Sequence, residues 1–100
     1  MKETFLRKRL NTILYQKETI DEVVSFVENT VKLLGINDAC IVSVEDREYR
    51  AHTNINVEVV GYDKGDNAIH KEIIFDVWFE DDERDEVEEL DESSLEIRTF

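Results

Sequence analysis

The chain has 100 residues, 41% of them hydrophobic, and a formal net charge of −13 from 25 acidic and 12 basic side chains. This length fits one domain with a modest core. A surface so negative repels nucleic acid and anionic membranes and attracts basic proteins. No apolar run approaches the roughly 20 residues that a membrane-spanning helix needs, and charges interrupt the opening residues, where a signal peptide would be apolar. We therefore expect one cytoplasmic domain over residues 1–100, helical over 1–35 and rich in β-strands over 38–100.

The first 35 residues have the pattern of two amphipathic helices. Leucine and isoleucine recur at spacings of three and four over residues 3–16, which is typical of one helical face. A second apolar stripe covers residues 20–34, and Gly35 offers the left-handed conformation that commonly ends a helix. Thr19, followed three residues later by Glu22, predicts a capping box at the start of the second helix.

After the second helix the hydrophobic period changes to two, which is the period of β-strands. We expect strands at residues 39–45, 49–59, 69–80 and 95–100, with a hairpin loop at 63–67. That five-residue loop sets a register in which facing residues sum to 130, so Trp78 lies opposite His52 on the outward face. Two helices followed by a run of strands predict an α+β fold, with two N-terminal helices packed on one face of a four-stranded antiparallel meander.

The most unusual segment is acidic. Eleven of the 25 acidic residues lie between Glu80 and Glu96, most of them within residues 80–92, here called the acidic segment. The self-repulsion of so much like charge weakens a compact fold at low salt, so we expect a functional reason for it. The segment is predicted to be a loop or a short polar helix between the last two strands, anchored by Val87 and Leu90.

We predict that the acidic segment and Trp78 together form a partner-binding surface. Trp is enriched at interface hot spots, and an outward Trp among carboxylates fits such an anchor. The alternative is that a helix or a dimer mate covers Trp78 as ordinary core. The predicted surface consists of Asp76, Trp78, Glu80, Asp81, Asp82, Glu83, Asp85, Glu86, Glu88 and Glu89.

No pattern predicts catalysis, a metal site or a cofactor. Paired-carboxylate catalysis needs two acids in different environments, whereas these acids share one solvated run. An EF-hand loop counted from Asp81 has Glu86 where a glycine is required. His52 and His70 fall far apart along the predicted hairpin, and the lone Cys40 fits a small buried hydrophobe better than a nucleophile. We expect no enzyme activity, no cofactor and no bound metal.

In charge and size, though not in any motif, the chain resembles the acidic DNA-mimic proteins of phages and plasmids, such as anti-CRISPR and anti-restriction proteins. The resemblance implies a non-enzymatic inhibitor that binds a basic nuclease or DNA-binding effector, as a monomer or homodimer, without contacting nucleic acid or membrane itself. A folded array of carboxylates can occupy a basic groove and release the counterions that phosphates release. The alternatives are an immunity protein or antitoxin that neutralises a basic toxin, and an acidic adaptor or assembly domain.

Overall fold

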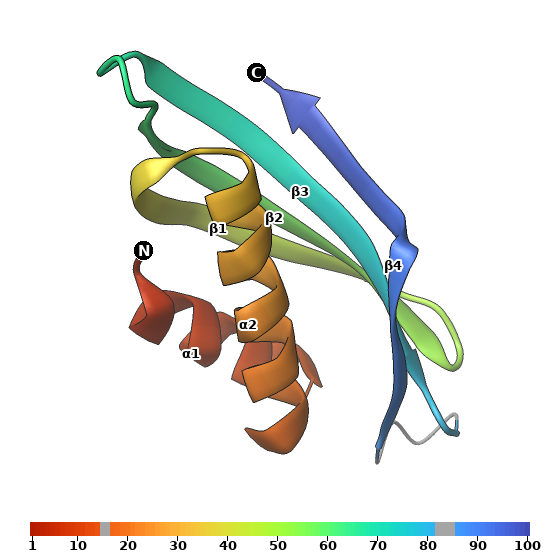
Figure 1. Ribbon diagram of the computed structural model, residues 1–100. Coiled ribbons are helices and arrows are strands. Elements are labelled where there is room, and N and C mark those ends of the chain that lie inside the picture. Colours follow the sequence, from red (N-terminus) through yellow and green to blue (C-terminus); the bar gives the residue numbers. More distant parts are fainter. Residues whose placement is uncertain (15–16, 82–85) are drawn as a thin grey trace.

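The computed structural model describes residues 1–14, 17–81 and 86–100. Its elements follow the order α1 (Glu3–Leu14), α2 (Lys17–Leu33), β1 (Asn37–Glu48), β2 (His52–Tyr62), β3 (Ala68–Phe79) and β4 (Val87–Thr99). Each strand pairs antiparallel with the next, in the order β1-β2-β3-β4. Both helices lie on one face of this long, twisted sheet (Figure 1). The predicted α+β fold, two helices on one face of a four-stranded meander, is confirmed.

Helix α1 is held by a leucine stripe. Leu6, Leu10 and Leu14 recur every four residues, so they share one helical face, and all three are fully buried. This face packs against α2 and β1. At the helix surface, Arg7 pairs with Glu3 of its own helix and with Asp21 of α2. Residues 1–17 contain five lysines and arginines, and at least one of them, Arg7, therefore forms ion pairs within the fold.

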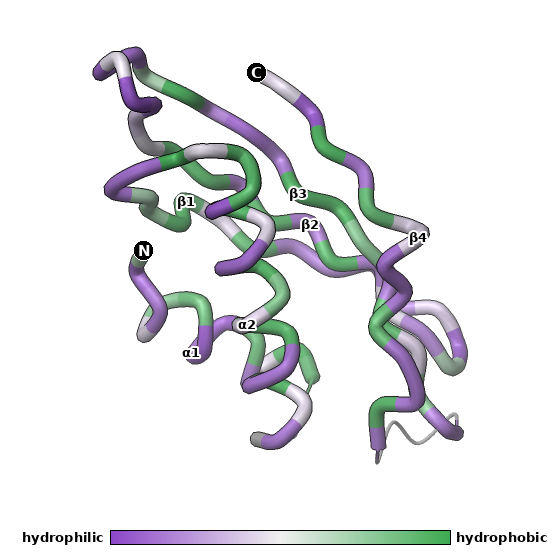
Figure 2. The backbone as a smooth tube through the Cα atoms, viewed as in Figure 1, coloured by the Kyte–Doolittle hydropathy of each residue, from purple (hydrophilic) through white to green (hydrophobic). Residues whose placement is uncertain are grey.

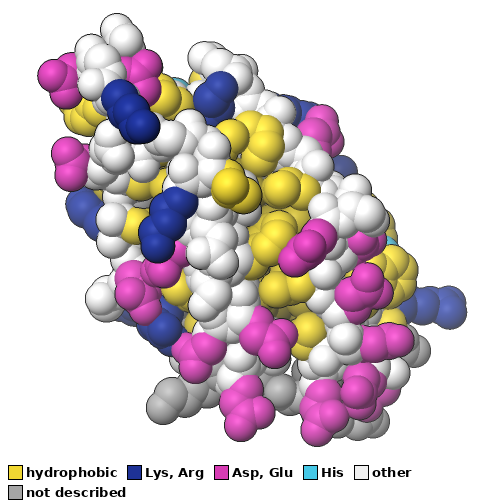
Figure 3. Space-filling model, viewed as in Figure 1, with side chains coloured by type: hydrophobic (Ala, Val, Ile, Leu, Met, Phe, Trp, Pro, Cys, Tyr) yellow, Lys and Arg dark blue, Asp and Glu magenta, His cyan; other side chains and the backbone are white. Residues whose placement is uncertain are grey.

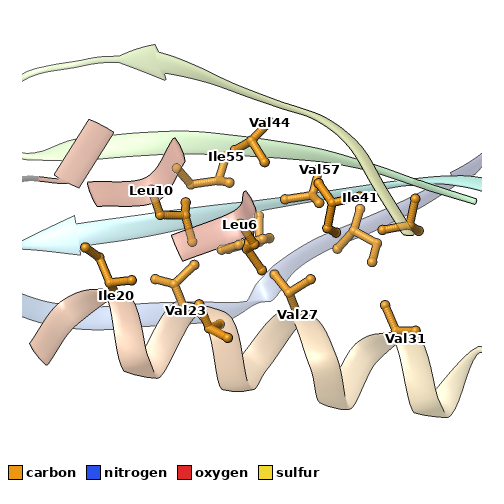
Figure 4. Packing of buried hydrophobic residues seen from close by; sticks show 14 of the residues in the cluster. Leu6, Leu10, Ile20, Val23, Val27, Val31, Ile41, Val44, Ile55 and Val57 are labelled. Carbon is orange, nitrogen blue, oxygen red and sulfur yellow. The ribbon is translucent and has the colours of Figure 1, made fainter. Parts of the chain in front are cut away.

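Helix α2 forms one wall of the core. Its buried face carries Ile20, Val23, Val24, Val27 and Val31, as the apolar stripe predicted. The opposite wall comes from β2 and β3, where hydrophobic and hydrophilic residues alternate along the chain (Figure 2). Their buried hydrophobic residues with odd numbers are Ile55, Val57, Val59, Ile73, Phe75, Val77 and Phe79. Figure 4 shows the valines of α2 facing the strand residues across this core.

The predicted start of α2 is wrong. The helix begins at Lys17, so Thr19 is its third residue and lies inside the first turn instead of capping it. Thr19 is 5% exposed, which places it against the core. Lys17 and Glu18 are both good helix formers, and they extend the helix by two residues on the N-terminal side of Thr19. The helix propensity of these two residues and the burial of Thr19 outweigh the capping-box pattern in the sequence.

The predicted end of α2 is confirmed. Gly35 has φ +69°, the left-handed region that favours glycine. The N–H of Gly35 donates to the carbonyl of Lys32 at 3.0 Å, and the N–H of Ile36 donates to the carbonyl of Val31 at 3.3 Å. These two bonds form a Schellman motif, which satisfies the last carbonyls of the helix. Val31 and Ile36 are both buried, so the chain turns directly into the core.

The central hairpin has the predicted register. Every pair between β2 and β3 sums to 130, including His52 with Trp78 and Val57 with Ile73. The loop is residues 63–67, and the Asp63 carboxylate accepts the N–H groups of Gly65 and Asn67 at 2.8 and 3.0 Å. These bonds, first of all those from Asn67, lower the pKa of Asp63.

Strands β1 and β2 differ from their predicted bounds. Strand β1 covers Asn37–Glu48, which is longer than residues 39–45. Strand β2 begins at His52, so Tyr49 belongs to the turn that joins β1 to β2. The N–H of Tyr49 donates to the carbonyl of His52 at 2.9 Å, which closes that turn.

The largest correction concerns β4. The strand begins at Val87 instead of residue 95, so the second half of the acidic segment is strand and not loop or helix. Val87 and Leu90 do anchor it, because they pair with Phe79 and Val77 and pack on the core. Pairing with a buried neighbouring strand here overrides the low β propensity of Asp and Glu.

A bulge divides β4 into two halves. Asp91 pairs with Asp76, whereas the next pair joins Glu96 to Ile74, so residues 92–95 leave the regular ladder. The hydroxyl of Ser94 accepts the N–H of Asp76 at 2.7 Å and donates to the carbonyl of Asp91 at 2.6 Å. Figure 1 shows β4 bending at its middle. The Ser94 hydroxyl thus bonds to the backbone of both strands at the bulge.

The described residues leave few polar groups unsatisfied. Within them, every buried side-chain nitrogen and oxygen has a hydrogen-bond partner. Neither α1 nor α2, as far as they are described, has the length and apolar character needed to cross a bilayer.

Candidate partner-binding surface

The sheet face opposite the helices, here called the outer face, is predominantly acidic. Side chains alternate between the two faces of a strand, so residues between buried neighbours point outward. Within the described residues, two arginines share the outer face, Arg47 and Arg98. The acids that the register places there are Glu45, Glu58, Glu72, Asp76, Glu89, Asp91 and Glu96. Seven carboxylates against two guanidinium groups leave this face strongly negative.

A shallow depression of about 420 Å³ crosses the middle of the outer face. Its floor includes Asn54, Asn56 and Ile74, and acids and arginines of β1 and β4 form its sides. The side-chain amide of Asn54 donates to the carboxylate of Asp76 at 2.9 Å and holds it in place. Arg98 lies 3.0 Å from Glu96 and 3.9 Å from Glu72. The depression is therefore a polar surface with fixed side chains, large enough for a few side chains of a partner.

Glu58 connects three strands on this face. Its carboxylate accepts the Ser43 hydroxyl of β1 at 2.9 Å, and it lies 2.5 Å from Nε2 of His70 on β3. These contacts lower the pKa of Glu58, with the His70 bond as the largest cause and the Ser43 bond next. The ring of His70 stacks on Phe100 with 4.2 Å between centroids. Glu58 is thus charged and rigidly held at neutral pH.

Trp78 ends a stack of three rings at the other end of the outer face. Its ring centroid lies 4.3 Å from that of His52, and the His52 centroid lies 4.5 Å from that of Tyr49. Trp78 is 37% exposed and pairs with Glu89 of β4. Both helices lie on the opposite side of the sheet, so within the described residues no helix covers Trp78. The predicted outward position of Trp78 is confirmed; the part played by Tyr49 was missed, because Tyr49 was assigned to a strand.

The residues predicted for the binding surface do not all lie on the outer face. Asp76, Trp78 and Glu89 do, as pairs of the β2-β3-β4 ladder. Glu88 is exposed in β4 and lies between the paired residues Val87 and Glu89. The remaining described acids, Glu80, Asp81 and Glu86, lie where β3 and β4 are joined, and Asp82, Glu83 and Asp85 are outside the described residues.

Glu80 and Glu86 face each other at the base of the connection between β3 and β4. The N–H of Glu80 donates to the carbonyl of Glu86 at 2.9 Å. Their side chains also interact, and the hydrogen bond and repulsion from Glu86 raise the pKa of Glu80. Two carboxyl groups so close favour a shared proton. This end of the sheet therefore combines high negative charge with one acid that is protonated more easily than usual.

The sequence prediction missed part of the acidic surface. Glu45, Glu58, Glu72 and Glu96 belong to the outer face, but none was among the residues predicted to bind a partner. For Glu96 the missing information is the full length of β4, because its bulge interrupts the alternation that signals a strand. Glu45 could be recognised as an acid at the end of a β-branched strand, but nothing in the sequence indicated that its side chain lies on the same face as the other acids.

The described side chains do not combine into a recognisable catalytic or metal-binding arrangement. Among them, no group of three or more His, Cys, Asp and Glu residues is placed to hold a metal ion. Ser43, Glu58 and His70 contain the residue types of a hydrolytic triad. Their order is different, since Glu58 lies between the other two and Ser43 donates to Glu58 instead of to the imidazole. The expectation of a protein without catalysis or metal stays a prediction.

No protein-family model, curated protein sequence or solved structure matches this chain. The features that remain are the seven acids and the partly exposed Trp78 ring that share the outer face of the sheet, and they make that face the candidate functional surface.

Proposed function

We propose that the protein is a non-enzymatic inhibitor that binds a nucleic-acid-binding protein through the outer face and competes with nucleic acid for its basic groove. One observation carries the proposal: seven carboxylates share a sheet face that neither helix covers. A basic groove gains affinity for phosphate by releasing counterions, and fixed carboxylates release them in the same way. Strands hold these side chains in place, so binding orders few of them.

The geometry of a sheet gives the carboxylates a spacing suited to this role. Neighbouring strands lie about 4.8 Å apart, and residues on one face of a strand recur about every 6.8 Å. The pairs Glu58 with Glu72 and Asp76 with Asp91 face each other across neighbouring strands. Their separations are of the same order as the rise of about 3.4 Å per phosphate along a DNA strand. A groove that accepts phosphates therefore finds acceptors at similar intervals.

Trp78 supplies an anchor beside this charge. Its ring is partly exposed and already stacked on His52, so little side-chain freedom remains to be lost on binding. An arginine or lysine of the partner can lie over an aromatic ring while it approaches Glu89. Such anchors commonly contribute much of the binding energy at an interface.

The proposal is tested by capture from a lysate treated with nuclease. The immobilised protein should retain nucleic-acid-binding proteins at low salt and release them as salt rises, because the interaction is electrostatic. Added double-stranded DNA should compete for the retained protein. A partner that binds despite excess DNA favours an immunity protein or antitoxin instead. Salt-insensitive binding through an apolar surface favours an adaptor.

Matched variants locate the surface. Glu45→Gln with Glu89→Gln removes two exposed carboxylates of the outer face, and Glu18→Gln with Asp66→Asn removes two from α2 and the β2–β3 loop. If each exposed ion pair contributes up to about 1 kcal/mol, the outer-face variant should lose about tenfold in affinity. The second variant should bind within about twofold of the wild type. Equal losses would show that only net charge matters, which contradicts a specific surface.

A further inference from the structure

A second surface lies on the helix side of the sheet. The helices leave β4 uncovered, and an apolar groove runs between α2 and this strand (Figure 3). Figure 3 shows hydrophobic side chains exposed along the groove and acidic side chains gathered around its lower end. This groove does not belong to the outer face, since the sheet separates the two.

The groove lining combines two hydrophobic side chains, Phe26 and Leu90, with five polar ones. It encloses about 470 Å³ and is lined by Asp21, Glu22, Ser25, Phe26 and Asn29 of α2 and by Leu90 and Glu92 of β4. Phe26 packs on the buried Phe75, with 4.8 Å between ring centroids, and remains partly exposed. Along β4, Leu95 and Ile97 are also only partly buried. Apolar surface therefore continues beyond the groove on the strand side.

One exposed leucine extends the same surface on the helix side. Leu33 follows Phe26 by seven residues, or two helical turns, so both side chains leave α2 on the same side. Leu33 is 88% exposed. An exposed leucine alone needs no explanation. Leu33 lies in line with the partly exposed Phe26 and beside an open groove, so it completes a stripe that a partner can cover.

We propose that this groove docks a basic amphipathic helix of a partner protein, which lies beside α2 and covers β4. Charge complementarity selects the partner. The groove lining contains three acids, and among the described lining residues no lysine or arginine. Asp21 already pairs with Arg7 of α1, so Glu22 and Glu92 are the acids that a basic partner would meet. An amphipathic helix with apolar residues on one side and lysine or arginine along its flanks fits an apolar groove with an acidic rim.

The fold favours a helix over a strand as the occupant. Addition of a strand needs a regular edge, and the bulge at residues 92–95 interrupts the ladder of β4. A helix beside α2, at the usual separation of about 8–10 Å, would instead complete the helix layer over the sheet. A second copy of this chain is disfavoured, because each copy carries a net charge of −13. The inference is independent of the proposed function, which uses the opposite face.

The test uses a labelled synthetic peptide of about 18 residues, with leucines at helical spacing and lysines along the flanks. Two control peptides have the same composition in scrambled order, or glutamates in place of the lysines. Fluorescence anisotropy gives the Kd, and amide chemical shifts locate the bound peptide. The basic amphipathic peptide should bind and shift signals of α2 and β4. The control peptides should bind at least about tenfold more weakly, because one lacks an apolar face and the other is repelled.

Variants then identify the contacts. Glu22→Gln with Glu92→Gln should weaken the peptide about fivefold, whereas Asp38→Asn with Asp66→Asn changes the charge equally at two exposed acids outside the groove lining and the outer face, and it should have little effect. Leu33→Ser should weaken it several-fold through lost apolar contact. The matched change is Val42→Ser, which alters another exposed hydrophobic residue outside the groove, and it should leave the Kd unchanged.

Four outcomes would overturn the inference. The basic peptide does not bind, the scrambled peptide binds equally well, the two charge variants lose equal affinity, or the chemical shift changes are confined to the outer face. The last result would still agree with an acidic outer face that binds basic proteins, so the experiment distinguishes failure of this inference from failure of the proposed function. Sedimentation that shows a dimer, with dilution altering the signals of α2 and β4, would make the occupant a second copy and would also refute a basic helix.

Discussion

At the scale of single residues, Gly61 shows how closely the chain packs where β2 passes the end of α2. A Cβ at this position would lie 2.4 Å from Cγ2 of Ile36 and 2.7 Å from the carbonyl oxygen of Asn37. Gly61→Ala should therefore destabilise the fold by about 1–3 kcal/mol, as overpacking does. Gly65→Ala is the matched control, since its Cβ would meet the side chains of Asn67 and Asp63, at 3.0 and 3.4 Å, and no backbone atom that close. Urea unfolding of both variants checks this, and equal losses would contradict the close approach.

Glu58 gives the fold a dependence on pH. Its pKa in the folded protein is lower than the ordinary 4.5, first because of His70 and then because of Ser43. The charged form is therefore favoured by folding, and its contribution to stability is present above pH 4.5 and is lost as the pH falls through the lowered pKa. Thermal melting between neutral and acid pH should show a smaller loss for Glu58→Gln than for the wild type. An identical loss of stability in the two proteins would show that Glu58 does not contribute to the pH dependence.

Glu80 should act in the opposite direction. Contact with Glu86 raises its pKa in the folded protein. Folding then favours the protonated form, so repulsion at this site is relieved as the pH falls through the raised pKa. At neutral pH, Glu80→Gln should leave stability unchanged or raise it. Loss of stability in this variant would show that the pair is held by contacts other than the shared proton.

At the scale of elements, α2 carries the core. Val27 is fully buried and faces the sheet, so Val27→Asp places a carboxylate where no partner is available. Such a burial costs several kcal/mol, which is enough to unfold a domain with ordinary stability. Ser25→Asp is the control on the exposed side of the same helix. Circular dichroism should show an unfolded Val27→Asp protein and a folded Ser25→Asp protein; unchanged melting of the former would contradict the packing.

The bulge in β4 depends on Ser94. Its hydroxyl accepts the N–H of Asp76 and donates to the carbonyl of Asp91, at 2.7 and 2.6 Å. Ser94→Ala leaves that N–H without this acceptor, and the expected loss is about 1–3 kcal/mol of stability. Hydrogen exchange at Asp76 should accelerate, because the bond that protects its amide is gone. Ser25→Ala, at an exposed helical site, should change neither quantity.

The elements differ in how far their sequence reveals them. The register of the central hairpin was predicted to the residue, since a tight loop and unbroken alternation leave one register that buries Ile73, Phe75 and Val77. Strand β4 was predicted only at its end. Its bulge shifts the alternation, and its acids disfavour a strand until β3 is present to pair with them. The acids of the outer face could be recognised only where the strand that carries them was recognised.

At the scale of the whole molecule, the sheet separates two kinds of surface. The outer face is charged and ends in the exposed ring of Trp78, whereas the helix side has an apolar groove with an acidic rim. A partner with a basic groove fits the first, and a basic amphipathic helix fits the second. One partner can use only one side of the sheet unless it wraps around an edge. Blocking one surface by mutation should therefore leave binding at the other intact.

The net charge of −13 gives stability and binding opposite responses to salt. The Debye length falls from about 30 Å at 0.01 M to about 8 Å at 0.15 M, so salt screens the repulsion among the chain's own carboxylates. The unfolding free energy should therefore rise over this range, by about 1 kcal/mol, because the compact state suffers most from self-repulsion. Affinity for a basic partner should fall over the same range, because salt also screens the attraction. Urea unfolding and partner titration at both concentrations measure the two quantities. In the variant Glu45→Gln with Glu89→Gln, the salt dependence of the unfolding free energy and that of the affinity should both become smaller, since the same carboxylates repel one another and attract the partner. A variant that loses the salt dependence of binding while keeping that of stability would show that binding and self-repulsion depend on different acids.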